Sequence, residues 1–277
     1  MAEYSPMMQH YLATKAEYKD CILFYRLGDF YEMFFDDALV VSKELELTLT
    51  GKDCGQEERA PMCGVPFHAA ETYINRLVSN GHKVAICEQM EDPKQAKGIV
   101  KREVIKVVTP GTNLNSQALD ETKNNYLMSI VYLGDVLGVA IADYSTGDFF
   151  VTEIETGAEL IDEINKFVPS EIILNEYFAM SGLDLTFISE KLSISVSTLE
   201  NWYFDDDSCK AKLKEHFHVN MLDGLGIKDY PVGIDAAGAL LIYLTQTQKS
   251  DMSHITSIVP YTTGKYMLID SSSRRNL

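Results

Sequence analysis

A polar stretch near the middle of the sequence constrains the fold more than any other feature. Residues 113–125 read NLNSQALDETKNN, a composition typical of a linker between folded parts. The chain has 277 residues, the length of two ordinary domains. We therefore expect a first domain over 1–113, a linker over 114–125, a second domain over 126–248 and a new, truncated region over 249–277.

Helical and strand patterns alternate in the first part, which predicts a mixed α/β domain. Ser5 and Pro6 are typical of the start of a helix that runs towards Tyr18. Further helical patterns cover 29–45 and 69–80, strand patterns cover 22–25, 83–87 and 104–108, and residues 109–111 have the sequence of a type II turn.

The second part predicts another α/β domain. Three strand patterns, at 126–133, 136–142 and 149–154, follow one another with short turns between them, which indicates an antiparallel meander. Helical and strand patterns then alternate over 158–166, 171–174, 207–217 and 235–247.

Composition indicates a folded protein without a membrane span. Hydrophobic residues make up 46% of the chain and charged residues 23%, and no apolar run approaches the about 18 residues of a transmembrane helix. The N-terminal residues lack the basic start and apolar core of a secretion signal. The five cysteines contain no C-x-x-C pair, which argues against a disulfide framework or a zinc site. We expect a cytoplasmic protein.

The charge is unevenly distributed along the chain. A net charge of −17 argues against nucleic-acid binding by the whole surface. Residues 1–113 carry 13 Lys and Arg against 17 Asp and Glu, a net of −4, whereas residues 114–277 carry 11 against 24, a net of −13. The stretch 93–106 is locally basic, with five Lys and Arg against one Glu. Any contact with DNA should therefore lie in the first part.

Sequence signatures of nucleotide and metal sites are missing. Gly51-Lys52 is followed by Asp53, so the phosphate-binding G-x-x-x-x-G-K-[ST] pattern does not occur. His216 and His218 have no third ligand nearby in the sequence, which favours a surface pair over a metal site.

The segment from Gly28 to Phe34 has a structural and a functional interpretation. In the structural one, Asp29 caps a helix, Glu32 is its capping-box partner and Phe30 is a core residue of the apolar stripe. In the functional one, the ring of Phe30 is exposed at a strand-to-helix junction and stacks on a base, and the Glu32 carboxylate accepts a hydrogen bond from a base edge.

Several blocks of the sequence resemble the bacterial MutS family of DNA mismatch repair proteins. Residues 24–34, FYRLGDFYEMF, resemble the family's mismatch-reading segment. Residues 61–69, 84–89 and 108–112 resemble further landmarks in the same order, and 273–277 resembles the start of the family's lever region. The resemblance implies two mixed α/β domains in tandem, the second an RNase H-like connector, followed by the start of a mainly helical lever.

The resemblance also implies a function and site residues. In the family a Phe wedges into the duplex and a Glu hydrogen-bonds the mispaired base; these positions are Phe30 and Glu32. Leu27, Lys52 and Arg102 are the implied contacts with the DNA groove or backbone. The chain would recognise mismatched or unpaired bases and so initiate mismatch repair, without enzymatic activity or a cofactor of its own.

The remaining implications concern partners. ATP, Mg²⁺ and a homodimer are expected only for the full-length protein. The connector would relay the state of the DNA to the ATPase part and to MutL. The protein would lie in the cytoplasm, on the nucleoid when bound to DNA. An RNase H-like second domain leaves one alternative open, a metal-dependent nuclease that uses Asp143 and Asp148 as metal ligands.

Overall fold

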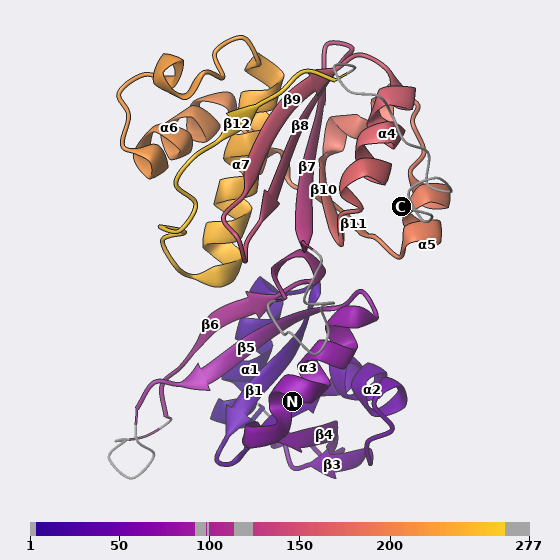
Figure 1. Ribbon diagram of the computed structural model, residues 1–277. Helices are drawn as coiled ribbons and strands as arrows, with labels where there is room; N and C mark the ends of the chain where they lie inside the picture. The colour runs from indigo at the N-terminus through magenta and orange to yellow at the C-terminus, as the bar shows by residue number, and fades with distance from the viewer. Residues whose placement is uncertain (1–3, 92–97, 99, 114–123, 264–277) are drawn as a thin grey trace. The chain divides into compact units, whose positions relative to one another are not determined.

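The computed structural model describes residues 4–91, 98, 100–113 and 124–263, and these form two compact units (Figure 1). The first contains the described residues up to Asn113 together with Thr247–Lys249, and the second contains 124–246 and 250–263. Each unit has a six-stranded sheet with helices packed against it. The prediction of two mixed α/β domains in tandem is confirmed.

The sheet of the first unit has the strand order β3-β4-β2-β1-β5-β6. Strands β1 and β5 are parallel, and the other neighbours are antiparallel. The elements are α1 (Pro6–Glu17), β1 (Cys21–Leu27), β2 (Phe30–Phe34), α2 (Phe35–Glu44), β3 (Thr50–Lys52), β4 (Ala60–Pro66), η1 (Phe67–Ala69), α3 (Ala70–Ser79), β5 (Lys83–Gln89), β6 (Arg102–Val108) and η2 (Pro110–Thr112).

Strand β1 is buried on both faces because helices cover both sides of this sheet. Leu23 and Tyr25 pack with Met8 and Tyr11 of α1. Their neighbours on the other face pack against α2 and α3, where Ala38, Val41, Ile74 and Leu77 are buried. The alternation of side chains along a strand therefore supplies two separate cores.

The predicted helix from Asp29 is wrong over its first turns. Gly28 has φ +60°, which lets Gly28-Asp29 form a two-residue turn, and the chain reverses as β2 alongside β1. Leu27 pairs with Phe30, so Glu32 is a strand residue and caps no helix. The helix begins only at Phe35, and the predicted apolar stripe is correct within it. The turn predicted at 109–111 is instead the short helix η2, capped by the side chain of Thr109.

The sheet of the second unit has the order β11-β10-β7-β8-β9-β12. Its elements are β7 (Tyr126–Leu133), β8 (Val136–Asp143), β9 (Phe149–Ile154), α4 (Gly157–Phe167), β10 (Glu171–Asn175), η3 (Glu176–Ser181), α5 (Thr186–Leu192), β11 (Ser195–Leu199), η4 (Asn201–Phe204), α6 (Asp206–Phe217), η5 (Leu222–Leu225), α7 (Pro231–Gln248) and β12 (Val259–Pro260). Strands β7, β8 and β9 form the expected antiparallel meander, and β10 is parallel to β7 and β11. This is the RNase H-like strand arrangement.

Helix α7 packs very closely on this sheet. A Cβ added at Gly138 of β8 would lie 2.2 Å from the carbonyl oxygen of Val232, near the start of α7. The Glu153 carboxylate of β9 accepts hydrogen bonds from the amides of Val232 and Gly233, at 2.6 and 2.9 Å. The helix N-terminus is thus capped by the sheet against which it packs.

The expected lever region is not seen where it was predicted to start. Residues 250–263 belong to the second unit, because β12 pairs in parallel with β9 and so extends its sheet. The rest of that region, 264–277, and nearly all of the expected linker, 114–123, lie outside the described residues. Among the described helices, none is both long and apolar enough to cross a membrane. All five cysteines are buried and free of disulfides, as expected.

Candidate nucleic-acid interface

Phe30 lies at the tip of the β1–β2 hairpin and its side chain is 46% exposed. The next residue, Tyr31, is 7% exposed and packs against Phe24. Strand alternation places Phe30 and Glu32 on one face of β2 and Tyr31 on the other. The sequence therefore presents an aromatic ring and a carboxylate together, side by side on one short strand.

Contacts from two other segments and from Arg26 of β1 itself brace this hairpin tip. The carbonyl of Asp29 accepts a hydrogen bond from the amide of Phe67 at 2.9 Å, and the amide of Gly28 donates to Oε1 of Gln89 at 3.1 Å. Nε of Arg26 donates to the carbonyl of Gly28 at 2.5 Å. All three bonds involve backbone atoms of the turn, so they hold the backbone from which the Phe30 side chain extends.

Arg26 links these contacts to one another. Its guanidinium carbon lies 3.8 Å from the centre of the Phe67 ring, and its Nη1 lies 3.2 Å from Oε1 of Glu88. Phe67 is itself 43% exposed. Arg26 pairs with Tyr31 across the hairpin and so lies on the opposite face from Phe30 and Glu32. Neither Arg26 nor Phe67 was predicted near the hairpin tip, because a single Arg and a single aromatic after a proline carry no local pattern.

Glu32 is paired with Lys52, which the sequence analysis had assigned separately. Nζ of Lys52 lies 2.8 Å from Oε2 and 3.1 Å from Oε1 of Glu32. The side chain of Glu32 is 14% exposed and that of Lys52 is 35% exposed. Gly64 lies directly opposite Glu32 on β4, and a Cβ there would be 3.5 Å from Cγ of Glu32. The structure thus joins two predicted site residues in one ion pair.

The other two predicted contact residues have different surroundings. Leu27 ends β1 and is half-buried, packed against the core on the α1 side of the sheet. Arg102 is 8% exposed, and its guanidinium donates to the carbonyls of Arg26 and Val100 at 2.8 and 2.9 Å. This placement favours a role for Arg102 in holding β6 beside the end of β1.

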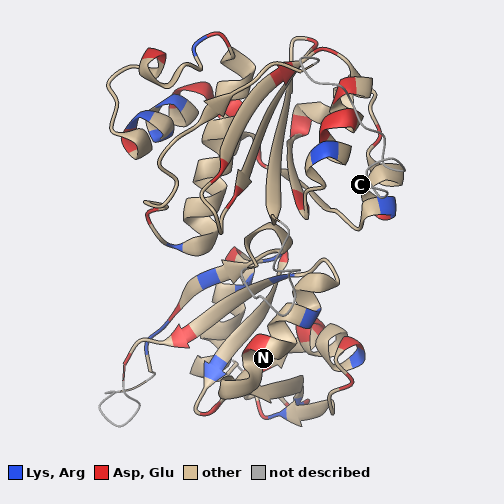
Figure 2. Cartoon of the chain, viewed as in Figure 1, with Lys and Arg blue, Asp and Glu red and all other residues tan. Residues whose placement is uncertain are grey.

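Basic and acidic residues are interspersed along the described part of the first unit (Figure 2). Figure 2 shows its Lys and Arg residues scattered among acidic ones. Within the locally basic stretch, Lys101 pairs with Glu103 at 2.7 Å, while Lys94 and Lys97 lie outside the described residues. Electrostatic attraction for a polyanion is therefore local on the described part of this unit.

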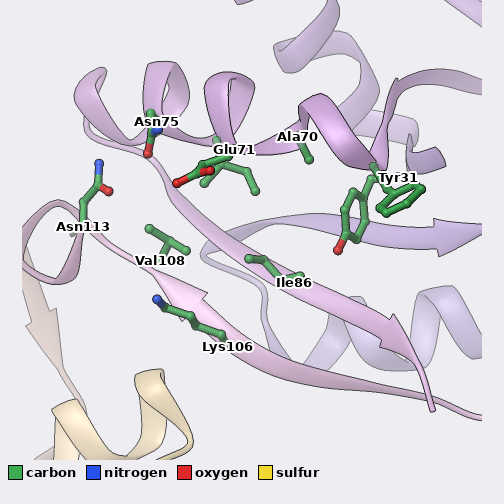
Figure 3. Close-up of a pocket in the computed structure, with 10 residues that line it drawn as sticks. Tyr31, Ala70, Glu71, Asn75, Ile86, Lys106, Val108 and Asn113 are labelled. Carbon is green, nitrogen blue, oxygen red and sulfur yellow. The ribbon is translucent and has the colours of Figure 1, made fainter. Parts of the chain in front are cut away.

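A cavity of about 310 Å³ lies between α3 and strands β5 and β6 (Figure 3). Tyr31, Glu71, Ile86 and Lys106 are among the residues that line it. Burial lowers the pKa of Lys106, and the nearby Glu71 partly opposes that change. Because the Tyr31 side chain lines this cavity, the cavity is on the opposite face of β2 from Phe30 and Glu32, and Phe67, which also lines it, lies between the cavity and the hairpin tip.

The two candidate nuclease carboxylates, Asp143 and Asp148, accept hydrogen bonds from residues in the adjoining turn and loop. Asp143 is fully buried, and its Oδ1 accepts hydrogen bonds from the amide and hydroxyl of Ser145, at 2.7 and 2.6 Å. Its Oδ2 accepts from the amide of Asn125 at 3.0 Å, and Asp148 accepts from Asn124. Within the described ranges no group of three or more His, Cys, Asp or Glu side chains could hold a metal ion. The nuclease alternative and the His216–His218 metal site are therefore not favoured.

Comparisons with known proteins assign both units to one family. Residues 5–117 match the family model for MutS domain I, and residues 125–256 match that for MutS domain II. The DNA mismatch repair protein MutS of Lachnoclostridium phytofermentans is 63% identical over 277 residues, which are 100% of this chain and 30% of that protein. The MutS proteins of Ruminiclostridium cellulolyticum and Acetivibrio thermocellus are 54% and 52% identical, over 100% of this chain and 32% of each relative. The chain thus spans about a third of the length of these relatives.

Proposed function

The chain belongs to the MutS family of DNA mismatch repair proteins, and on that premise we propose that its first unit recognises mismatched or unpaired bases in duplex DNA. Phe30 inserts into the duplex and stacks on the mispaired base, and Glu32 hydrogen-bonds that base. The observation that carries this proposal is the exposed Phe30 ring at a braced hairpin tip, with Glu32 on the same strand face.

Stacking explains how one site can serve many mismatches. Every base has a π-face, so an aromatic ring stacks on any of them. Insertion of the ring also requires two base pairs to unstack, and this costs least where pairing is already poor. Preference for a mismatch is then a response to local deformability more than to base identity.

The neighbouring residues would support this insertion in different ways. Leu27 lies opposite Phe30 in the hairpin and would face the groove that Phe30 enters. Lys52 would contact a phosphate, since it is a partly exposed cation that lies beside Glu32. Arg102 is the least exposed of the three. We therefore assign it an indirect role, in which its hydrogen bond to the carbonyl of Arg26 holds the end of β1 in place.

The second unit would act as a connector between DNA recognition and later steps. Its acidic composition suits a surface for protein partners better than one for DNA. We propose that it relays the DNA-bound state to an ATPase part and to MutL within a full-length, homodimeric protein that uses ATP and Mg²⁺ and lies in the cytoplasm on the nucleoid. The described units themselves would bind DNA and carry out no catalysis.

Competition binding tests this function. A labelled duplex with a single mismatch is displaced by unlabelled mismatched or fully paired duplex, and fluorescence anisotropy gives the two affinities. The measurement uses a full-length family protein that carries this chain as its N-terminal part. Tighter binding of the mismatched duplex supports the proposal, and equal affinity for the two duplexes contradicts it.

A further inference from the structure

The carboxylate that would bind the mispaired base is already occupied in the structure. Both oxygens of Glu32 are within hydrogen-bond distance of Nζ of Lys52, at 3.1 and 2.8 Å. Glu32 is also the more buried partner, with 14% of its side chain exposed. A base edge therefore meets a carboxylate that already has a cationic partner. The base must either share the carboxylate with Lys52 or displace the Lys52 ammonium group.

Lys52 can move away from Glu32 without a change in the backbone of the β1–β2 hairpin. It is the last residue of β3, the edge strand, and β4 lies between β3 and β2 in the sheet. Its side chain is 35% exposed and carries the ammonium group on four flexible methylene groups. The side chain alone can swing away, while the backbone contacts that hold Phe30 stay in place.

We propose that Lys52 competes with the mispaired base for the Glu32 carboxylate and so sets the strength of the mismatch preference. This inference rests on the proposed function of Phe30 and Glu32. On a fully paired duplex no base donor is offered, and the ion pair persists and neutralises Glu32 beside the phosphates. On a mismatched duplex the base donor replaces the ammonium group, and the free energy of the broken ion pair is subtracted from the gain in binding.

A double-mutant cycle isolates this competition. Lys52→Met keeps the length of the side chain and removes its charge, and Glu32→Gln removes the charge of its partner. With Glu32 in place, Lys52→Met should increase the mismatch-to-match affinity ratio about two- to fivefold relative to the same substitution in the Glu32→Gln background, the factor expected for a partly exposed ion pair. Any contact of Lys52 with phosphate is present in both backgrounds and cancels.

Two further variants serve as controls in the same full-length protein. Lys52→Arg keeps a positive charge beside Glu32 and so preserves the competition, and its ratio should stay below that of Lys52→Met. Lys43→Met removes one exposed positive charge from α2 of the same unit and should lower both affinities equally, if at all. Circular dichroism and melting temperature confirm that each variant is folded.

The outcomes separate this inference from the proposed function. If Phe30→Ala and Glu32→Gln leave the ratio unchanged, the proposed function fails. If those substitutions reduce the ratio, but Lys52→Met changes it equally in both backgrounds or lowers it only with Glu32 present, the function stands and the competition is refuted. A higher ratio confined to the Glu32 background supports the competition.

Discussion

Phe30 and Tyr31 are neighbours in the chain and lie on opposite faces of β2, one 46% and the other 7% exposed. Tyr31 donates a hydrogen bond to Glu88 of β5, and burial raises the pKa of the Tyr31 hydroxyl. The buried, hydrogen-bonded Tyr31 fixes the rotation of β2 about its own axis. That rotation in turn places Phe30 and Glu32 on the outward side of the strand, where both can reach a ligand.

Replacement of Phe30 by alanine should abolish the mismatch preference. Stacking of a base on an aromatic ring is worth about 1–3 kcal/mol, or roughly 5- to 150-fold in affinity. Fluorescence anisotropy with mismatched and paired duplexes measures the change. Phe187→Ala, at a 77% exposed position of the second unit, is the matched control and should keep the preference. An unchanged preference in Phe30→Ala, with a native circular dichroism spectrum, would show that another group reads the mismatch.

Glu32→Gln should alter mismatch discrimination with little effect on stability. Because Glu32 lies in β2 and caps no helix, its loss removes only a partly exposed ion pair, worth about 0.2–1 kcal/mol. Loss of its negative charge near phosphates should also tighten binding to fully paired DNA. Urea unfolding and duplex competition measure the two effects. A large loss of stability without a change in discrimination would assign Glu32 a structural role instead.

The stability of the second unit should decrease as pH rises from about 4 to 7, owing to Asp235. Burial, together with the nearby Asp206 carboxylate, raises the pKa of Asp235 to about 7 from an ordinary value of 3.8. Between these values the folded state binds a proton that the unfolded state has lost, so ionisation at higher pH favours unfolding. Within the described residues, Oδ1 of Asp235 has no hydrogen-bond partner.

Asp235→Asn tests this pH dependence. The variant should lose less stability than the wild type between pH 5 and pH 8, by about 1–3 kcal/mol, because no buried charge forms. Urea unfolding at the two pH values measures it. Asp207→Asn, at an exposed position of α6, should behave like the wild type. Parallel pH profiles for the wild type and Asp235→Asn would rule out a buried ionisation at this position.

Asp143→Ala should destabilise the second unit whether or not Mg²⁺ is present. The substitution removes the acceptor of the buried Asn125 amide, at a cost of about 1–3 kcal/mol, and also that of the more exposed Ser145 amide. Melting temperatures in Mg²⁺ and in EDTA measure the effect. Asp148→Ala, which loses only an exposed bond to Asn124, should cost much less. Stabilisation of the wild type by Mg²⁺ that disappears in Asp143→Ala would revive the metal-site alternative.

Gly138→Ala should be among the most destabilising single substitutions in β8. The added methyl group would overlap the carbonyl of Val232, and overpacking of a core costs typically about 1–3 kcal/mol. Urea unfolding measures the loss. A Cβ at Gly224 would meet no atom within 4 Å, so Gly224→Ala is the control and should change stability little. Equal effects of the two substitutions would mean that α7 moves away from the sheet at low cost.

The sequence predicted most long helices and the central strands, because these have strong periodic patterns. The hairpin at Gly28 was missed because Asp29 and Glu32 have the spacing of a capping box, and because Phe30 and Phe34 fit both a helix and a strand. Strands β3 and β4 were not predicted, since glycine and proline recur in them, as at Gly51 and Pro61.

The candidate site was only partly predictable for a related reason. Phe30, Glu32 and Lys52 were identified through the family resemblance, but their positions in the sequence say nothing of the ion pair between Glu32 and Lys52. That contact depends on the order of β3, β4 and β2 in the sheet, which no local pattern encodes. The same holds for Arg26 and Phe67, which meet only once β4 and β1 are in place.

The bracing of the turn at Gly28 and Asp29 has a mechanical consequence. Duplex DNA is stiff, with a persistence length of about 150 base pairs, so it pushes back on a side chain that enters the base stack. A loosely held turn would move away from the DNA instead, and insertion of the side chain would then depend on the flexibility of the protein. Because hydrogen bonds with Phe67, Gln89 and Arg26 hold the turn, the proposed insertion of Phe30 would place the deformation on the DNA, and the quality of base pairing would decide whether the ring can enter.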